Sequence, residues 1–149
     1  MNVLFLCTGN SARSIIAEAI YNHVQKQHGY GHAFSAGSKP VGRVNPYALQ
    51  TLTRHGIPTY DTRSKPLSDF LGVNAPVMDY VISVCDEASK ECPIWPERKD
   101  GTPAKRLHWS IHDPAAVKGT DEEIAVAFEA AYRDIYGRIE NFVKKEFWD

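Results

Sequence analysis

The N-terminal segment constrains the fold of this chain more than any other feature. Val3–Leu6 is a short, fully apolar run, the pattern of a strand that is buried on both faces of a parallel sheet. A polar loop follows at once, from Cys7 to Ser14, and apolar residues then recur at helical spacing until Gly29. This passage from strand through loop to helix predicts an α/β protein, with a site beyond the carboxyl end of the first strand.

Later segments continue the alternation of strands and helices. Ala33–Ala36 and Tyr80–Val84 are expected to form buried strands, and Arg106–Trp109 a short last strand. The third strand delivers Cys85 at its carboxyl end, as the first strand delivers Cys7. Because sites in such sheets lie beyond the carboxyl ends of the strands, both cysteines are candidates for the same site.

Capping signals mark the starts of two later helices. Asn45 followed by Pro46 is an N-cap with a proline in the first turn. Thr120 and Glu123 form a capping box ahead of an apolar stripe that reaches Phe142. The sequence thus predicts a parallel twisted sheet of about four strands with helices on both faces. No repeat, low-complexity tract or linker divides the chain, so residues 1–149 are expected to form one domain.

Composition and charge exclude several classes of function. The chain has 149 residues, of which 43 % are hydrophobic and 23 % charged, as in ordinary globular domains. A net charge of −1 gives no basis for a nucleic-acid or membrane-surface partner. The sequence shows neither a signal peptide nor a membrane span. We therefore expect a cytoplasmic protein whose three cysteines are reactive or free rather than structural disulfides.

The loop from Cys7 to Arg13 contains the residue types that an oxyanion site needs. Backbone N–H groups in a tight loop and at a helix N-terminus can cradle a tetrahedral anion, and Gly9 is expected to permit the required backbone angles. Arg13 can hold two anion oxygens, and the same positive field favours the thiolate of Cys7. Ser14 is placed to donate a hydrogen bond to that thiolate. The candidate oxyanion-binding residues are Thr8, Gly9, Asn10, Ser11, Ala12, Arg13 and Ser14.

The spacing of Cys7 and Arg13 also fits a buried strand-end cysteine beside a surface arginine, but the flanking strand and helix favour a site. The whole loop resembles the phosphate-binding loop of the low-molecular-weight tyrosine phosphatases and of the arsenate reductases of that fold. The resemblance covers essentially the whole chain, with further matches at Ser35-Ala36-Gly37, His55-Gly56-Ile57 and Asp113-Pro114. Many members have a second cysteine just before the loop arginine. Ala12 stands there in this chain, so a thiol that resolves Cys7 must come from elsewhere.

Asp113-Pro114 also matches a catalytic pair of this family. The resemblance implies that Asp113 is the general acid that protonates the leaving oxygen, with Pro114 fixing the backbone. By itself, Asp-Pro is also common in turns. The phosphatases continue with tyrosines that line a phosphotyrosine pocket, whereas Ala115 and Ala116 follow here. These small residues favour a pocket for a small inorganic anion.

Cys85 and Cys92 resemble the redox segment of thioredoxin-coupled arsenate reductases, in which two cysteines at this spacing carry a disulfide cascade. The residues alone also fit two small apolar side chains or a metal pair that lacks further ligands. If Asp86–Glu91 is a short helix, the two cysteines lie about 10 Å apart along its axis, beyond the roughly 7 Å Cα limit of a disulfide. Pro93 stops that helix, which is cheap to unwind. The fold of this segment is therefore predicted to depend on its redox state.

No metal or organic cofactor is expected. The cysteines and histidines show neither a Cys-x2-Cys nor a His-Glu-x-x-His pattern. Some members of the family bind a monovalent cation near the position of Asn10, with a glutamate at the position of Glu18 and an acidic residue in a later loop. This chain has Lys65 in that loop, so the ion is not predicted.

The resemblance implies an arsenate reductase that serves arsenical resistance. Cys7 attacks arsenate held by Arg13, Asp113 protonates the departing oxygen, and Cys85 attacks the Cys7 sulfur to release arsenite. Cys92 then leaves a Cys85–Cys92 disulfide for thioredoxin, glutaredoxin or another thiol. Phosphate or sulfate would act as analogues of arsenate. The alternative is a tyrosine phosphatase that hydrolyses a Cys7–phosphate intermediate. A non-catalytic anion-binding regulator is a third possibility, which the presence of nucleophile, arginine and acid together argues against.

Overall fold

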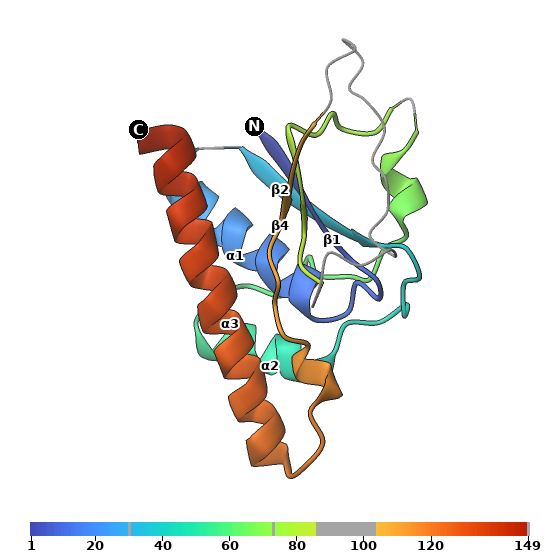
Figure 1. Cartoon of the computed structure of the whole chain (residues 1–149), viewed down its shortest axis with the longest axis vertical. Helices are drawn as coiled ribbons and strands as arrows, with labels where there is room; N and C mark the ends of the chain where they lie inside the picture. The colour runs from blue at the N-terminus through green and yellow to red at the C-terminus, as the bar shows by residue number, and fades with distance from the viewer. Residues whose placement is uncertain (30, 73, 86–103, 149) are drawn as a thin grey trace.

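The computed structural model describes residues 1–29, 31–72, 74–85 and 104–148. At its centre lies a four-stranded sheet with the order β2-β1-β3-β4, in which every neighbouring pair is parallel (Figure 1). The strands are β1 (Asn2–Cys7), β2 (His32–Gly37), β3 (Tyr80–Ser83) and β4 (Lys105–His108). The parallel α/β architecture predicted from the sequence is confirmed, with strand ends that differ from the expected ones by at most one residue.

Helical segments cover both faces of the sheet, but they differ in kind. The helices α1 (Arg13–His28) and α3 (Asp121–Val143) lie on one face, with α2 (Pro46–Arg54) packed against them (Figure 1). The short 3-10 helix η1 (Leu67–Phe70) lies on the other face, against β2. A second 3-10 helix, η2 (Pro114–Ala116), precedes α3, and a π-helical turn, η3 (Lys144–Trp148), follows it.

The apolar run of β1 is explained by burial on both sides. Val3 and Phe5 face the core beneath α1 and α3, whereas Leu4 and Leu6 pack into the cluster that includes Leu67 of η1. All four β1 side chains are at most 1 % exposed. A strand that is buried on both faces needs apolar residues at every position. Its apolar residues therefore form a continuous run and do not alternate with polar ones.

The helix boundaries follow the predicted local signals. Asn45 accepts a hydrogen bond from Tyr47 N at 2.9 Å, and Thr120 and Glu123 form the full capping box of α3. Gly29 ends α1 in the left-handed conformation, with φ of 71°. No helix among the described residues is long and apolar enough to cross a membrane.

Candidate active site

The oxyanion loop runs from β1 into α1 and is held from its outer side by residues 39–45. Three backbone N–H groups of this segment donate to loop carbonyl oxygens, each at 2.9 Å: Lys39 to Thr8, Val41 to Gly9 and Asn45 to Ser11. These bonds satisfy three loop carbonyls, while the N–H groups of Gly9 and Asn10 hydrogen-bond the Cys7 sulfur, as expected of an anion-binding nest.

Asn10, not Gly9, takes the left-handed backbone conformation of the loop, with φ of 45°. The role expected for Gly9 is therefore wrong in this respect. Asparagine tolerates this region better than most residues. Gly9 instead permits close packing, since a Cβ at that position would lie 3.1 Å from Val41 Cγ2.

The side chain of Asn10 is fully buried and joins two parts of the chain. Its Nδ2 donates to Ser14 Oγ at 2.8 Å, and its Oδ1 accepts from the backbone N of Lys65 at 2.7 Å. In the described part of the chain, Cys7 shows no hydrogen bond from Ser14, contrary to the prediction. Ser14 thus acts on the loop through Asn10.

Cys7 lies at the floor of the loop and is only 6 % exposed. Its surroundings lower the pKa of the thiol from the ordinary 9.0 to about 6. A hydrogen bond from the Cys85 side chain is the largest cause, and burial opposes it. The Arg13 charge and the backbone N–H groups of Gly9 and Asn10 lower the pKa further. Cys7 is therefore mainly a thiolate at neutral pH, the form that acts as a nucleophile.

Arg13 and Asp113 meet beside the loop although they are far apart in sequence. Arg13 Nη1 donates to the Ile111 carbonyl at 2.9 Å, and Arg13 Nη2 lies 3.6 Å from Asp113 Oδ2. The other carboxylate oxygen of Asp113 accepts from Ala115 N at 2.9 Å and so caps η2. These contacts fix the carboxylate at the edge of the site, with its side chain 31 % exposed.

Parallel pairing places Cys85 next to Cys7. Leu6 of β1 is in register with Ser83 of β3, and Val84 N donates to the Leu6 carbonyl at 2.9 Å. Cys85 is buried, and its thiol is the group that hydrogen-bonds Cys7. The structure thus brings together Cys7, Cys85, Arg13 and Asp113.

Cys92 and the expected helix Asp86–Glu91 lie outside the described residues, so their predictions stay untested. Within the described residues, no cluster of three or more His, Cys, Asp or Glu side chains is arranged to hold a metal ion.

Two supports of the site were not predicted from the sequence. They are the Ile111 carbonyl that holds Arg13 and the backbone N–H groups of residues 39–45 that bind the loop. Both are main-chain groups, which every residue type provides, so the residue types carry no signal for them.

Comparisons with known proteins agree with this geometry. The family of low molecular weight phosphotyrosine protein phosphatases matches residues 2–147. The chain therefore belongs to this family. An arsenate reductase of Shouchella clausii (strain KSM-K16) is 34 % identical over 142 residues, which cover 95 % of this chain and 94 % of that protein.

Two solved structures of arsenate reductases are also similar to the chain. One, in its phosphate-binding state, superposes with a TM-score of 0.74 at 26 % identity and covers 97 % of both chains. The other is a thioredoxin-dependent arsenate reductase of Corynebacterium glutamicum, with a TM-score of 0.59 and 28 % identity. It covers 95 % of this chain and 62 % of that one.

Proposed function

We propose that this chain is an arsenate reductase in which Cys7 is the nucleophile and Cys85 the first resolving thiol. The observation that carries the proposal is the position of two buried thiols, Cys7 and Cys85, at the carboxyl ends of the paired strands β1 and β3, beside the oxyanion loop. A phosphatase needs the nucleophile, the arginine and the acid, but it has no step for a second thiol at the nucleophile. The arsenate reductases among the relatives support the same choice.

The first step forms a bond between sulfur and arsenic. Arsenate binds to the loop N–H groups and to Arg13, and the Cys7 thiolate attacks the arsenic atom. Asp113 gives its proton to the departing oxygen, which leaves as water. The low pKa of Cys7 supplies the thiolate without a separate base.

The second step transfers the electrons. Cys85 attacks the Cys7 sulfur, the sulfur–arsenic bond breaks, and its electron pair stays on arsenic. The proton of the Cys85 thiol ends on an oxygen of the released arsenite. Arsenite leaves, and a Cys7–Cys85 disulfide remains. Cys92 then attacks Cys85, which frees Cys7 and leaves a Cys85–Cys92 disulfide for an external reductant. This last step rests on the sequence resemblance. We propose thioredoxin as the reductant because one similar structure is of a thioredoxin-dependent enzyme.

Hydrolysis of phosphate monoesters is the second candidate function, because the family is that of a phosphatase and the same Cys7, Arg13 and Asp113 serve it. In that case a water molecule would hydrolyse a Cys7–phosphate intermediate. Ala115 and Ala116 stand where tyrosines would grip a phenolic ring, which disfavours phosphotyrosine.

A single turnover without added reductant separates the two functions. Pre-reduced protein is mixed with arsenate, and free thiols and arsenite are counted after desalting. We expect loss of about two thiols and release of about one arsenite per chain. Cys7→Ser should abolish both. Cys85→Ser should abolish the release, and Cys92→Ser should retain it because the first disulfide still forms. Unchanged thiols together with steady hydrolysis of an aryl phosphate would replace this proposal with the phosphatase.

A further inference from the structure

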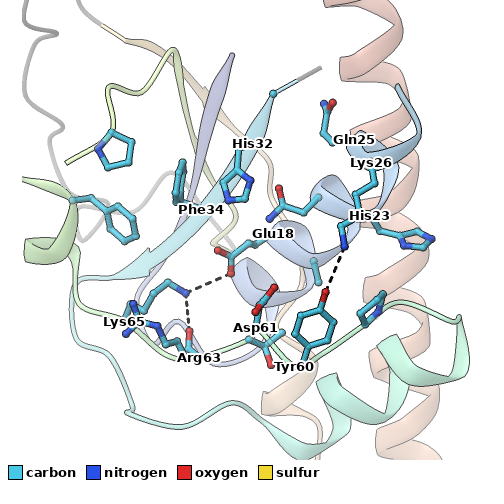
Figure 2. Close-up of a pocket in the computed structure, with 17 residues that line it drawn as sticks. Glu18, His23, Gln25, Lys26, His32, Phe34, Tyr60, Asp61, Arg63 and Lys65 are labelled. Carbon is cyan, nitrogen blue, oxygen red and sulfur yellow. Dashed lines mark hydrogen bonds and ion pairs between the residues drawn. The ribbon is translucent and has the colours of Figure 1, made fainter. Parts of the chain in front are cut away.

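A buried ion pair lies behind the oxyanion loop, outside the set of catalytic residues. Lys65 is 5 % exposed, and its Nζ lies 3.4 Å from Glu18 Oε1 of α1 (Figure 2). The same Nζ donates to Ser35 Oγ of β2 at 3.2 Å and to the Arg63 carbonyl at 2.7 Å. Ser35 Oγ in turn donates to Glu18 Oε1 at 2.8 Å. One ammonium group therefore joins a helix, a strand and its own loop.

The backbone of Lys65 connects this pair to the oxyanion loop. Its N–H donates to Asn10 Oδ1, and its carbonyl accepts from Gly37 N at 2.9 Å. Asn10 is the loop residue with positive φ, so the contact from Lys65 fixes the most constrained backbone position of the loop. Gly37 lies against the loop as well, since a Cβ on it would lie 2.6 Å from the Thr8 carbonyl oxygen.

We propose that Lys65 is a positioning residue of the oxyanion loop: its buried ammonium group holds residues 63–65 where the Lys65 N–H sets the conformation of Asn10. This inference deepens the proposed function, because it rests on the loop being the anion site. A surface lysine could not serve in this way, since water would compete for its donors.

Burial disfavours the charged forms of both Glu18 and Lys65. Burial raises the pKa of Glu18 and lowers that of Lys65, in each case against the attraction of the partner. Removing one partner of a buried pair leaves the other charge uncompensated, which costs far more than the pair contributes in net stability. For this pair, the contacts that it fixes explain its burial better than a net gain in stability does.

Glu18 and Lys65 line a cavity of about 500 Å³, through which a small ion in solution can reach the pair (Figure 2). Tyr60, which is 75 % exposed, and Lys26 line the same cavity, so the cavity reaches the surface. A small ammonium ion can therefore approach Glu18 when the lysine side chain is removed.

The test is Lys65→Ala, with Lys26→Ala as the matched control because Lys26 is an exposed lysine of the same cavity. Two properties are measured in reduced protein: the pH profile of Cys7 alkylation by iodoacetamide, resolved by peptide mass spectrometry, and the affinity for inorganic phosphate. We expect Lys65→Ala to raise the pKa of Cys7 and to weaken phosphate binding roughly tenfold. Loss of a residue that only orients the direct ligands of a bound metal has an effect of this size. Methylammonium should restore both properties, and the larger tetramethylammonium should not. Lys26→Ala should match the wild type.

If Lys65→Ala fails to fold, the double variant Glu18→Gln/Lys65→Met removes both charges at similar volume. We expect this protein to fold and to show the same weak phosphate binding, without rescue by methylammonium. Wild-type alkylation and phosphate affinity in either folded variant would overturn the proposal. So would a defect of Lys65→Ala that methylammonium does not repair. Neither readout requires arsenate turnover, so a failure of the reductase assay alone counts against the proposed function and leaves this inference standing.

Discussion

Cys7 and Cys85 stand at the carboxyl ends of neighbouring parallel strands, yet their surroundings give them different chemistry. Cys7 accepts a hydrogen bond from Cys85, the largest cause that lowers its pKa, and the field of Arg13 and two loop N–H groups lower it further, to about 6. Cys85 is equally buried, but its thiol donates to Cys7. In the proposed mechanism the first sulfur attacks the anion, and the second lies beside it to attack the first sulfur afterwards. The groups around a strand end, rather than the strand itself, therefore decide how a cysteine reacts.

The largest expected effect comes from replacing Cys85 in two ways. Both Cys85→Ser and Cys85→Ala should abolish arsenite release, because neither provides a sulfur that can attack Cys7. The variants should differ in the ionisation of Cys7. Serine keeps a donor, so the pKa should stay near 6, whereas alanine removes the largest cause that lowers it.

The measurement is the pH profile of Cys7 alkylation. In the wild type the thiolate, and with it the rate, is lost as pH falls through about 6. In Cys85→Ala this inflection should move to higher pH, so that alkylation at neutral pH becomes slower. Identical profiles for alanine and serine would show that Cys85 does not tune Cys7, and the contrast between the two sulfurs would fail.

A smaller effect is expected from Asp113→Asn. Asp113 is proposed to act in the step at Cys7, so this variant tests that step separately from the step at Cys85. Loss of the general acid should slow arsenite formation by about 10²-fold. Phosphate should bind about as well as in the wild type, because Asp113 is not among the groups proposed to hold the anion. Asparagine can still accept from Ala115 N, so η2 should persist.

Rapid-quench single turnovers with arsenate give this rate. Asp134→Asn is the control, since Asp134 pairs with Arg138 on the surface of α3. A normal rate in Asp113→Asn would remove Asp113 from the proposed mechanism.

The smallest effect on activity is expected from Thr120→Ala, at the capping box of α3. Loss of the cap should lower the free energy of unfolding by about 1 kcal/mol. The turnover rate should not change, because the hydrogen bonds of the Thr120 side chain join it to Glu123 within the cap itself. Urea denaturation and the single-turnover assay test both statements, and Thr120→Ser keeps the cap as the control. A large loss of turnover would mean that the chemistry of the two cysteines depends on α3 as well as on their own surroundings.

Local sequence signals were sufficient for much of the fold. The double-sided burial of β1 required a continuous apolar run, and the caps at Asn45 and Thr120 required specific side chains. The caps depend on interactions between near neighbours, and two-sided burial is recorded in the apolar run itself, so both could be predicted from the residues. The backbone conformation at Gly9 could not be predicted in this way. A glycine in a tight loop suggested positive φ, but contacts from Ser14 and Lys65 impose that conformation on Asn10.

The residues alone were sufficient to predict the order of strands and helices and the position of the oxyanion loop, and to propose Cys7 as its nucleophile and Arg13 as its anion-binding side chain. The tertiary structure decided the rest: that Cys85 hydrogen-bonds Cys7, that Asp113 lies beside Arg13, and that Lys65 is buried against Glu18. The physical reason is the range of the interactions. Periodicity and capping act over a few residues, whereas these contacts join segments far apart in the chain, and strand order and register bring those segments together only after folding.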